Sequence, residues 1–97
     1  MRKNYGEYIR AARKRAGIKQ TDLADAIGVD KAYLCRIEKG NQAAPPPEKI
    51  EIIAKELGED ADILTLRCGR IPEWIEILLR EEPEASVAAL SNIGKLS

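Results

Sequence analysis

Three basic side chains lie close together in the segment DKAYLCRIEKG, namely Lys31, Arg36 and Lys39. An arginine guanidinium can donate two parallel hydrogen bonds to one guanine edge, and a lysine ammonium can pair with a phosphate. The chain has no histidine, and its two cysteines are not spaced as a metal-binding pair. It also has no recognisable nucleophile–base pairing and no phosphate-cradling glycine loop. This chemistry is typical of anion recognition, so we expect no enzymatic activity and no cofactor.

Charge is distributed unevenly along a chain whose formal net charge is zero. Residues 1–39 contain ten Lys and Arg against five Asp and Glu, whereas residues 40–97 contain six against eleven. This pattern predicts one lobe that faces a polyanion and an acidic lobe that faces something else. No apolar run reaches the roughly 18 residues that span a bilayer, and no signal-peptide segment follows Arg2 and Lys3. We therefore expect a cytoplasmic protein that does not bind membranes.

Apolar residues repeat with helical spacing along most of the chain, and no segment alternates with the period of a strand. The pattern predicts an all-α protein whose first five helices lie within residues 4–17, 20–28, 30–40, 46–58 and 60–69. Asn4 and Asp30 are expected to cap two of these helices, and Gly17 is expected to end the first. The expected inward-facing residues of the fifth helix are Ile63, Leu64 and Cys68.

Gly28 separates two short helices, with apolar Ile27 and Val29 on either side. Apolar residues on both sides of a break indicate a buried corner, where glycine adopts a positive φ without a clash at Cβ. Two short helices that cross steeply at such a turn form a helix-turn-helix motif, and the second helix fits a DNA major groove about 12 Å wide. Because Leu34 and Ile37 face the interior, the second helix turns outward Lys31, Ala32, Cys35, Arg36 and Lys39.

The stretch from Tyr5 to Gly58 resembles the phage-repressor-like, XRE-type helix-turn-helix family. The matching segments, in order and at the family's spacing, are IRAARKRAGIKQ, LADAIGV, AYLCRIEKG and IEIIAKELG. The resemblance implies a five-helix, lambda-repressor-like DNA-binding bundle. It also implies a regulator that binds double-stranded operator DNA as a homodimer, and many members of the family are repressors. Lys19 stands where the family usually has a capping Ser or Thr, and Cys35 stands where Ser is usual.

The resemblance and the outward face of the second helix together predict the DNA contacts. Arg36 is the candidate for direct reading of a base, Lys31 for a base or a phosphate, and Ala32 for a thymine methyl group. Tyr33 either contacts a phosphate or packs, and Cys35 is either a small surface residue or a redox switch. The predicted phosphate contacts include Gln20, Lys39 and Asn41. The full predicted DNA-binding set is Gln20, Thr21, Lys31, Ala32, Tyr33, Cys35, Arg36, Lys39 and Asn41.

The resemblance further implies an ion pair between Arg13 and Glu38. Both residues are expected on the inner sides of their helices. An acidic side chain at a DNA-facing turn would repel phosphate unless an internal partner neutralised it. We therefore expect Arg13 and Glu38 to form a structural ion pair.

Residues 70–97 are predicted to form a helical extension beyond a DNA-binding domain of residues 1–69. Its apolar stripe consists of Trp74, Ile75, Leu78, Leu79, Val87, Leu90 and Ile93. This stripe either completes the core of the bundle or packs against a second copy, and we favour dimerisation because the acidic lobe does not face DNA. A different class of protein is also consistent with the pattern: an antitoxin or other protein-binding regulator whose tail grips a toxin or a protease.

Overall fold

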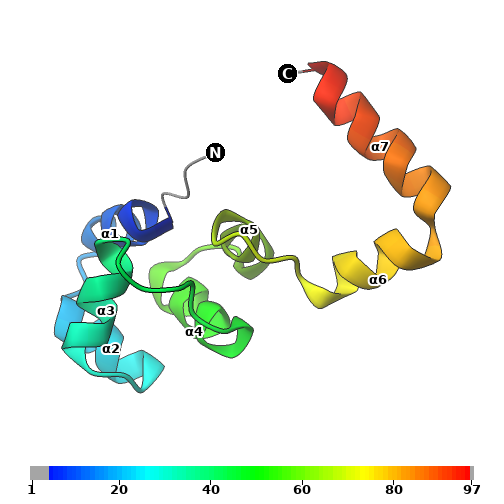
Figure 1. The fold of residues 1–97 in the computed structure, drawn as a ribbon. Coiled ribbons are helices and arrows are strands. Elements are labelled where there is room, and N and C mark those ends of the chain that lie inside the picture. The colour runs from blue at the N-terminus through cyan, green and yellow to red at the C-terminus, as the bar shows by residue number, and fades with distance from the viewer. Residues whose placement is uncertain (1–4, 97) are drawn as a thin grey trace.

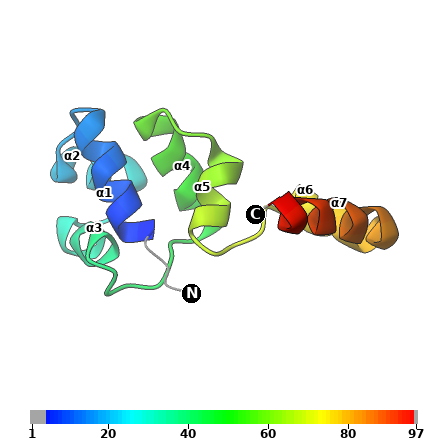
Figure 2. The same ribbon diagram turned by 90° about the horizontal axis from the view of Figure 1, so that it is seen from above.

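A computed structural model describes residues 5–96, and these residues form helices joined by short connections, with no strand among them. The helices are α1 (Tyr5–Arg15), α2 (Gln20–Ile27), α3 (Lys31–Glu38), α4 (Pro47–Leu57), α5 (Ala61–Arg67), α6 (Glu73–Glu81) and α7 (Pro83–Leu96). Helices α1 to α5 form a bundle, and α6 and α7 extend away from it (Figures 1 and 2). The predicted all-α fold with a five-helix bundle and a helical extension is confirmed. The predicted cap Asn4 lies outside the described residues.

The interior of the bundle is built from aliphatic side chains of all five helices. Helix α4 packs against both α2 and α5, while α3 packs against α1 and α2. The largest fully buried aliphatic side chains are Ile9, Leu23, Leu34, Ile37, Ile50, Ile53 and Leu64. Cys68 is buried with them, and burial raises the pKa of its thiol. This cysteine is therefore a small, protonated core residue.

The turn between α2 and α3 has the geometry that the sequence predicts. Gly28 has a φ of 79°, and its N–H donates to the carbonyl of Ala24 at 3.0 Å. The N–H of the partly buried Val29 donates to the same carbonyl, also at 3.0 Å. Asp30 then caps α3 by accepting a hydrogen bond from the Tyr33 N–H at 2.7 Å. These bonds fix the direction in which α3 leaves the turn.

Gly6 marks a close approach between α1 and the end of α3. A Cβ atom at this position would lie 2.3 Å from the carbonyl oxygen of Ile37 and 2.9 Å from that of Glu38. Both oxygens belong to the backbone, so a change of side-chain rotamer cannot relieve the clash. Helical periodicity does not predict this constraint, because it depends on the distance between two helices.

The substitution Gly6→Ala is expected to lower the free energy of unfolding by about 1–3 kcal/mol, because α1 must move away from α3. Urea unfolding followed by circular dichroism measures this change. Gly94→Ala in α7 is the matched control, because its added Cβ meets no atom within 4 Å. A Gly6→Ala protein as stable as the wild type would show that the α1–α3 contact is loose.

One predicted core residue of α5 faces the solvent instead. Ile63 is 53% exposed, whereas Leu64 and Cys68 are buried as predicted. The helix begins at its Asp60 cap, whose side chain accepts a hydrogen bond from the Ile63 N–H at 2.9 Å. Leu64 and Cys68 are four residues apart and define the buried side of this short helix, so Ile63 lies away from that side. The predicted inward orientation of Ile63 is wrong.

Helices α6 and α7, residues 73–96, form an arm. Contacts of the connection before α6 and of the first turn of α6 attach this arm to the bundle. The guanidinium of Arg70 donates to the carbonyl of Pro45 at 2.9 Å and to that of Ala44 at 2.7 Å. The indole Nε1–H of Trp74 donates to the carboxylate of Asp62 at 2.9 Å. Beyond these contacts the arm does not return to the bundle in either view (Figures 1 and 2).

The apolar side chains of the arm are largely uncovered. Trp74 is 58% exposed, Val87 is 63% exposed and Leu90 is 56% exposed, while Ile75 and Leu79 are half-buried. The arm therefore does not complete the core of the bundle in this structure. Among residues 5–96, no helix combines the length and the apolar character needed to cross a membrane.

Candidate nucleic-acid interface

Helices α2 and α3, which carry most of the predicted DNA contacts, lie at the end of the bundle away from the arm (Figure 1). The exposed members of the predicted set are Thr21, Lys31, Ala32, Arg36, Lys39 and Asn41, and the half-buried members are Gln20, Tyr33 and Cys35. The burial of Leu34 and Ile37 explains this division, because it turns the opposite side of α3 toward solvent. The outward face is basic, with Lys31, Arg36 and Lys39 on it.

A shallow hollow beside α3 brings some of these residues together. Its lining residues are Glu7, Arg10, Arg13, Gln20, Cys35, Glu38 and Lys39. Arg10 is absent from the sequence-predicted set, and the only signal that pointed to it was the excess of basic residues in the first part of the chain. The hollow therefore contains charges of both signs, with Arg10 of α1 and Lys39 as well as Glu7 and Glu38 among the lining residues.

Helix α2 begins with main-chain N–H groups that no side chain caps. Lys19 precedes the helix with an extended backbone and makes no capping hydrogen bond. A Ser or Thr at this position would occupy an N–H of the first turn with its hydroxyl oxygen. The first turn, which contains Gln20 and Thr21, therefore has main-chain donors and the positive end of a helix dipole available for a phosphate.

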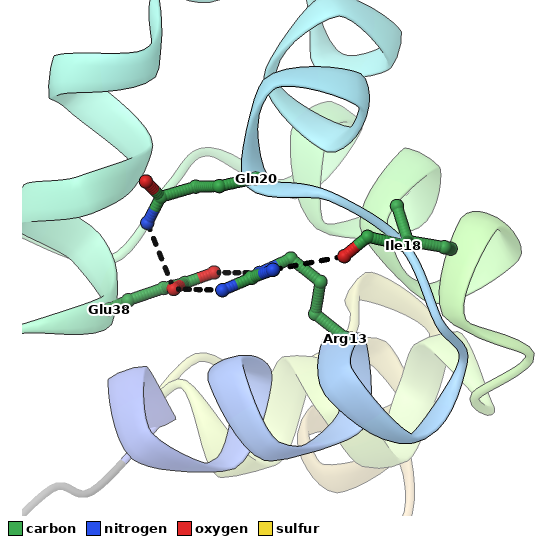
Figure 3. Close-up of polar contacts among 4 residues, drawn as sticks. All are labelled: Arg13, Ile18, Gln20 and Glu38. Carbon is green, nitrogen blue, oxygen red and sulfur yellow. Dashed lines mark hydrogen bonds and ion pairs between the residues drawn. The ribbon is translucent and has the colours of Figure 1, made fainter.

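An ion pair beneath this surface joins three elements of the bundle (Figure 3). The guanidinium of Arg13 donates from Nε to Glu38 Oε2 at 2.7 Å and from Nη2 to Oε1 at 3.0 Å. Its Nη1 donates to the carbonyl of Ile18 at 2.9 Å, and Gln20 Nε2 donates to Glu38 Oε1 at 3.0 Å. The hydrogen bond to Glu38 raises the pKa of Arg13, which stays charged. The structure thus contains the pair that the family resemblance implies, and it adds Gln20.

The position of this ion pair explains how a carboxylate can lie beside a DNA-facing surface. The side chains of Arg13 and Glu38 are only 10% and 3% exposed. Two bonds from the guanidinium and one from Gln20 satisfy the carboxylate internally. The pair also ties α1 and the connection before α2 to the last turn of α3, so it fixes the position of α3 in the bundle.

The exposed side chain of Arg36 contacts two other side chains of the same chain. Its Nε donates to Gln42 Oε1 at 3.0 Å, and its guanidinium carbon lies 5.9 Å from the centroid of the Tyr33 ring. Tyr33 packs against the core while it contacts Arg36, which supports the packing alternative for this residue. Gln42 lies in the loop after α3 and was not predicted as a site residue, because its contact with Arg36 depends on the path of that loop.

Cys35 is a free, half-buried thiol in the lining of the hollow. Cys68, by contrast, belongs to the buried hydrophobic core. This separation of environments is consistent with Cys35 as a small surface residue of α3.

The fold defines a helix-turn-helix protein. Helices α2 and α3 are short and meet at a tight glycine turn, a buried ion pair lies under α3, and the outer face of α3 is basic. The family model described as Helix-turn-helix matches residues 9–64. The chain belongs to this family, in its XRE-type branch.

Similar proteins support this assignment. The chain is 33% identical over 70 residues to the HTH-type transcriptional repressor RghR of Bacillus subtilis (strain 168). The match covers 72% of this chain and 52% of RghR, so the chain spans about half the length of that relative.

Two solved structures share the fold. The clp gene regulator ClgR from C. glutamicum aligns with a TM-score of 0.57 and 22% identity, over 69% of this chain and 86% of that chain. A chain of the SinR protein/SinI protein complex aligns with a TM-score of 0.56 and 23% identity, over 95% of this chain and 98% of that chain. At these identities the likeness concerns the fold alone, and the second match extends into the arm.

Proposed function

We propose that this protein is a sequence-specific regulator of transcription that binds duplex DNA through α3, and that it acts as a repressor on a palindromic operator. The single observation that carries this proposal is the basic outer face of α3, which projects from a rigid corner and is backed by a neutralised carboxylate. Arg36 reads a base, and Lys31 and Ala32 contact the same groove. The first turn of α2, together with Lys39 and Asn41, holds phosphates on either side.

The substitution Arg36→Ala is expected to weaken binding to the preferred site by about 1–3 kcal/mol and to relax the preference at one base pair, because a bidentate contact to a guanine is lost. Lys39→Ala is the matched control: it should weaken all sequences alike and flatten the slope of log affinity against log salt by about one unit. Fluorescence anisotropy with single-base-pair variants of the site separates the two effects. Equal losses on every sequence for Arg36→Ala would show that Arg36 contacts only the backbone.

The arm is the proposed dimerisation element. Trp74, Leu78, Val87 and Leu90 are exposed on it and need an apolar partner. A two-fold pair of arms would cover these side chains and present two copies of α3 about 34 Å apart, which is one turn of DNA. This spacing matches the half-sites of a palindromic operator.

A second candidate function uses the same arm against a different protein. The exposed apolar face of the arm favours this candidate. The similar chain from the SinR protein/SinI protein complex also favours it, because that structure contains two different proteins. In this alternative the chain is an antitoxin-like or other protein-binding regulator whose arm holds a toxin or a protease. For this candidate, we expect a pull-down with the wild-type chain to recover a stoichiometric protein partner. The Trp74→Ala, Leu78→Ala double variant should not recover it.

A further inference from the structure

The loop after α3 contains a side chain that contacts Arg36 directly. Gln42 is half-buried, and its Oε1 accepts the Nε–H of Arg36 at 3.0 Å. We propose that Gln42 is a positioning residue, which orients the guanidinium of Arg36 and thereby sets how strongly the protein discriminates at one base pair. This inference rests on the proposed function and names the residue that controls its specificity.

The main chain at Gln42 is anchored to the bundle from two sides. The hydroxyl of Tyr5, a buried core residue at the start of α1, donates to the Gln42 carbonyl. The N–H of the preceding residue, Asn41, donates to the Arg36 carbonyl at 2.8 Å. The N–H of Gly40, which has a φ of 77°, donates to the Ile37 carbonyl at 3.0 Å. The loop is therefore closed against the end of α3, and its amide side chain lies beside Arg36 in the unbound protein.

The contact determines which donors of Arg36 remain for DNA. A guanidinium has five N–H donors in one plane, one on Nε and four on the two Nη atoms. Because Gln42 accepts from Nε, the two Nη groups form the end of the fork that is left to bind the two acceptors of a guanine edge. The Tyr33 ring lies to one side of the guanidinium and further limits its orientation.

This arrangement affects specificity because it removes freedom from a long side chain before binding. An arginine that is already oriented loses less conformational entropy when it contacts a base. An arginine that swings freely can instead bind a nearby phosphate, which carries no sequence information. Gln42 should therefore influence discrimination between base pairs more than overall affinity.

The test uses the full chain and two variants of Gln42 with different chemistry. Gln42→Met keeps the length of the side chain and removes the acceptor, whereas Gln42→Glu keeps an acceptor for Arg36. Affinity is measured for the preferred site and for the same site changed at the base pair that the Arg36→Ala variant identifies. Thermal unfolding followed by circular dichroism verifies that both variants are folded.

Gln42→Met is expected to reduce discrimination at that base pair by about 2- to 10-fold, the range expected for one net hydrogen bond. The slope of log affinity against log salt should stay unchanged. In an Arg36→Ala background the same substitution should cause no further loss of discrimination, because Gln42 acts through Arg36. Gln42→Glu should retain discrimination while it weakens all sequences alike, since it adds a negative charge near phosphates.

Other outcomes would overturn the positioning role. In one such outcome the wild type selects a site and Arg36→Ala loses specificity, while Gln42→Met keeps full discrimination. That combination would rule out the positioning role of Gln42 and leave the proposed function intact. An equal effect of Gln42→Met with and without Arg36 would mean that Gln42 contacts DNA itself. If the wild type discriminates between no sequences, the proposed function and this inference fail together.

Discussion

The substitution Glu38→Ala is expected to lower the free energy of unfolding by about 3–5 kcal/mol, because it leaves a buried charge without its partner. The guanidinium of Arg13, whose side chain is 10% exposed in the wild type, would lose the acceptors of its Nε and Nη2 bonds. Gln20 would lose its acceptor as well. The side-chain hydrogen bonds that join the last turn of α3 to α1 and to the start of α2 would disappear together.

Thermal unfolding at a fixed protein concentration measures this effect, and a fall in Tm of at least about 12 °C is expected for a domain of this size. Glu76→Ala is the matched control, because it removes an exposed ion pair whose partner Arg80 is 66% exposed. That control should cost no more than about 0.5 kcal/mol. A Glu38→Ala protein with the Tm of the wild type would contradict a structural role for the buried pair.

Removing both members of the pair provides a further distinction. A double variant with Arg13→Met and Glu38→Leu has no stranded charge, so it should be more stable than either single variant. If the double variant is the least stable of the three, the stranded charge is not the main cost of the single substitutions.

If the arm makes the proposed dimer, truncation of the chain after Pro72 is expected to give a folded monomer that binds a palindromic site about 10²- to 10⁴-fold more weakly than the intact chain. The last residue of the hydrophobic core is Cys68, and no residue of α6 is buried. This cut keeps Arg70, whose bonds to Ala44 and Pro45 hold the connection before α4. Each half-site would then be bound without the contribution of the second.

Helix length supports a role for the arm in association. Helices α6 and α7 have 9 and 14 residues, and isolated helices of these lengths are marginal in water. They meet at the turn that joins them and then diverge (Figure 1), and Val87 and Leu90 are more than half exposed. A second arm that covers this face would stabilise both helices.

Sedimentation of the intact and truncated chains tests the role of the arm. We expect the intact chain to sediment as a dimer and the truncated chain as a monomer. The Trp74→Ala, Leu78→Ala double variant should also sediment as a monomer. A truncated chain that still sediments as a dimer would place the interface in the bundle. An intact chain that is monomeric at micromolar concentration would favour the protein-partner function instead.

The features that were predictable from the sequence are those set by local chemistry. The positive φ of Gly28 and the cap at Asp30 follow from residue type at a given place in a turn, and the structure contains both. The Arg13–Glu38 contact was accessible through the family resemblance, because two charged residues on inner helix faces need each other.

Features that depend on the distance between elements were not predictable. The need for Gly6 arises from how closely α1 approaches α3, and the contact between Gln42 and Arg36 arises from the path of a loop. Ile63 was misplaced because a short helix with apolar residues on several sides has no unique buried face by periodicity alone. The cap at Asp60 and the neighbouring α4 decide that face in the folded chain.

The most direct test of sequence-specific DNA binding is selection from a random pool of duplex DNA with the purified full chain at low salt. The expected result is enrichment of a palindrome with half-site centres about 10–10.5 base pairs apart, and loss of that enrichment at one symmetric position in the Arg36→Ala variant. A pool that shows no enriched sequence after repeated rounds would contradict the proposed function.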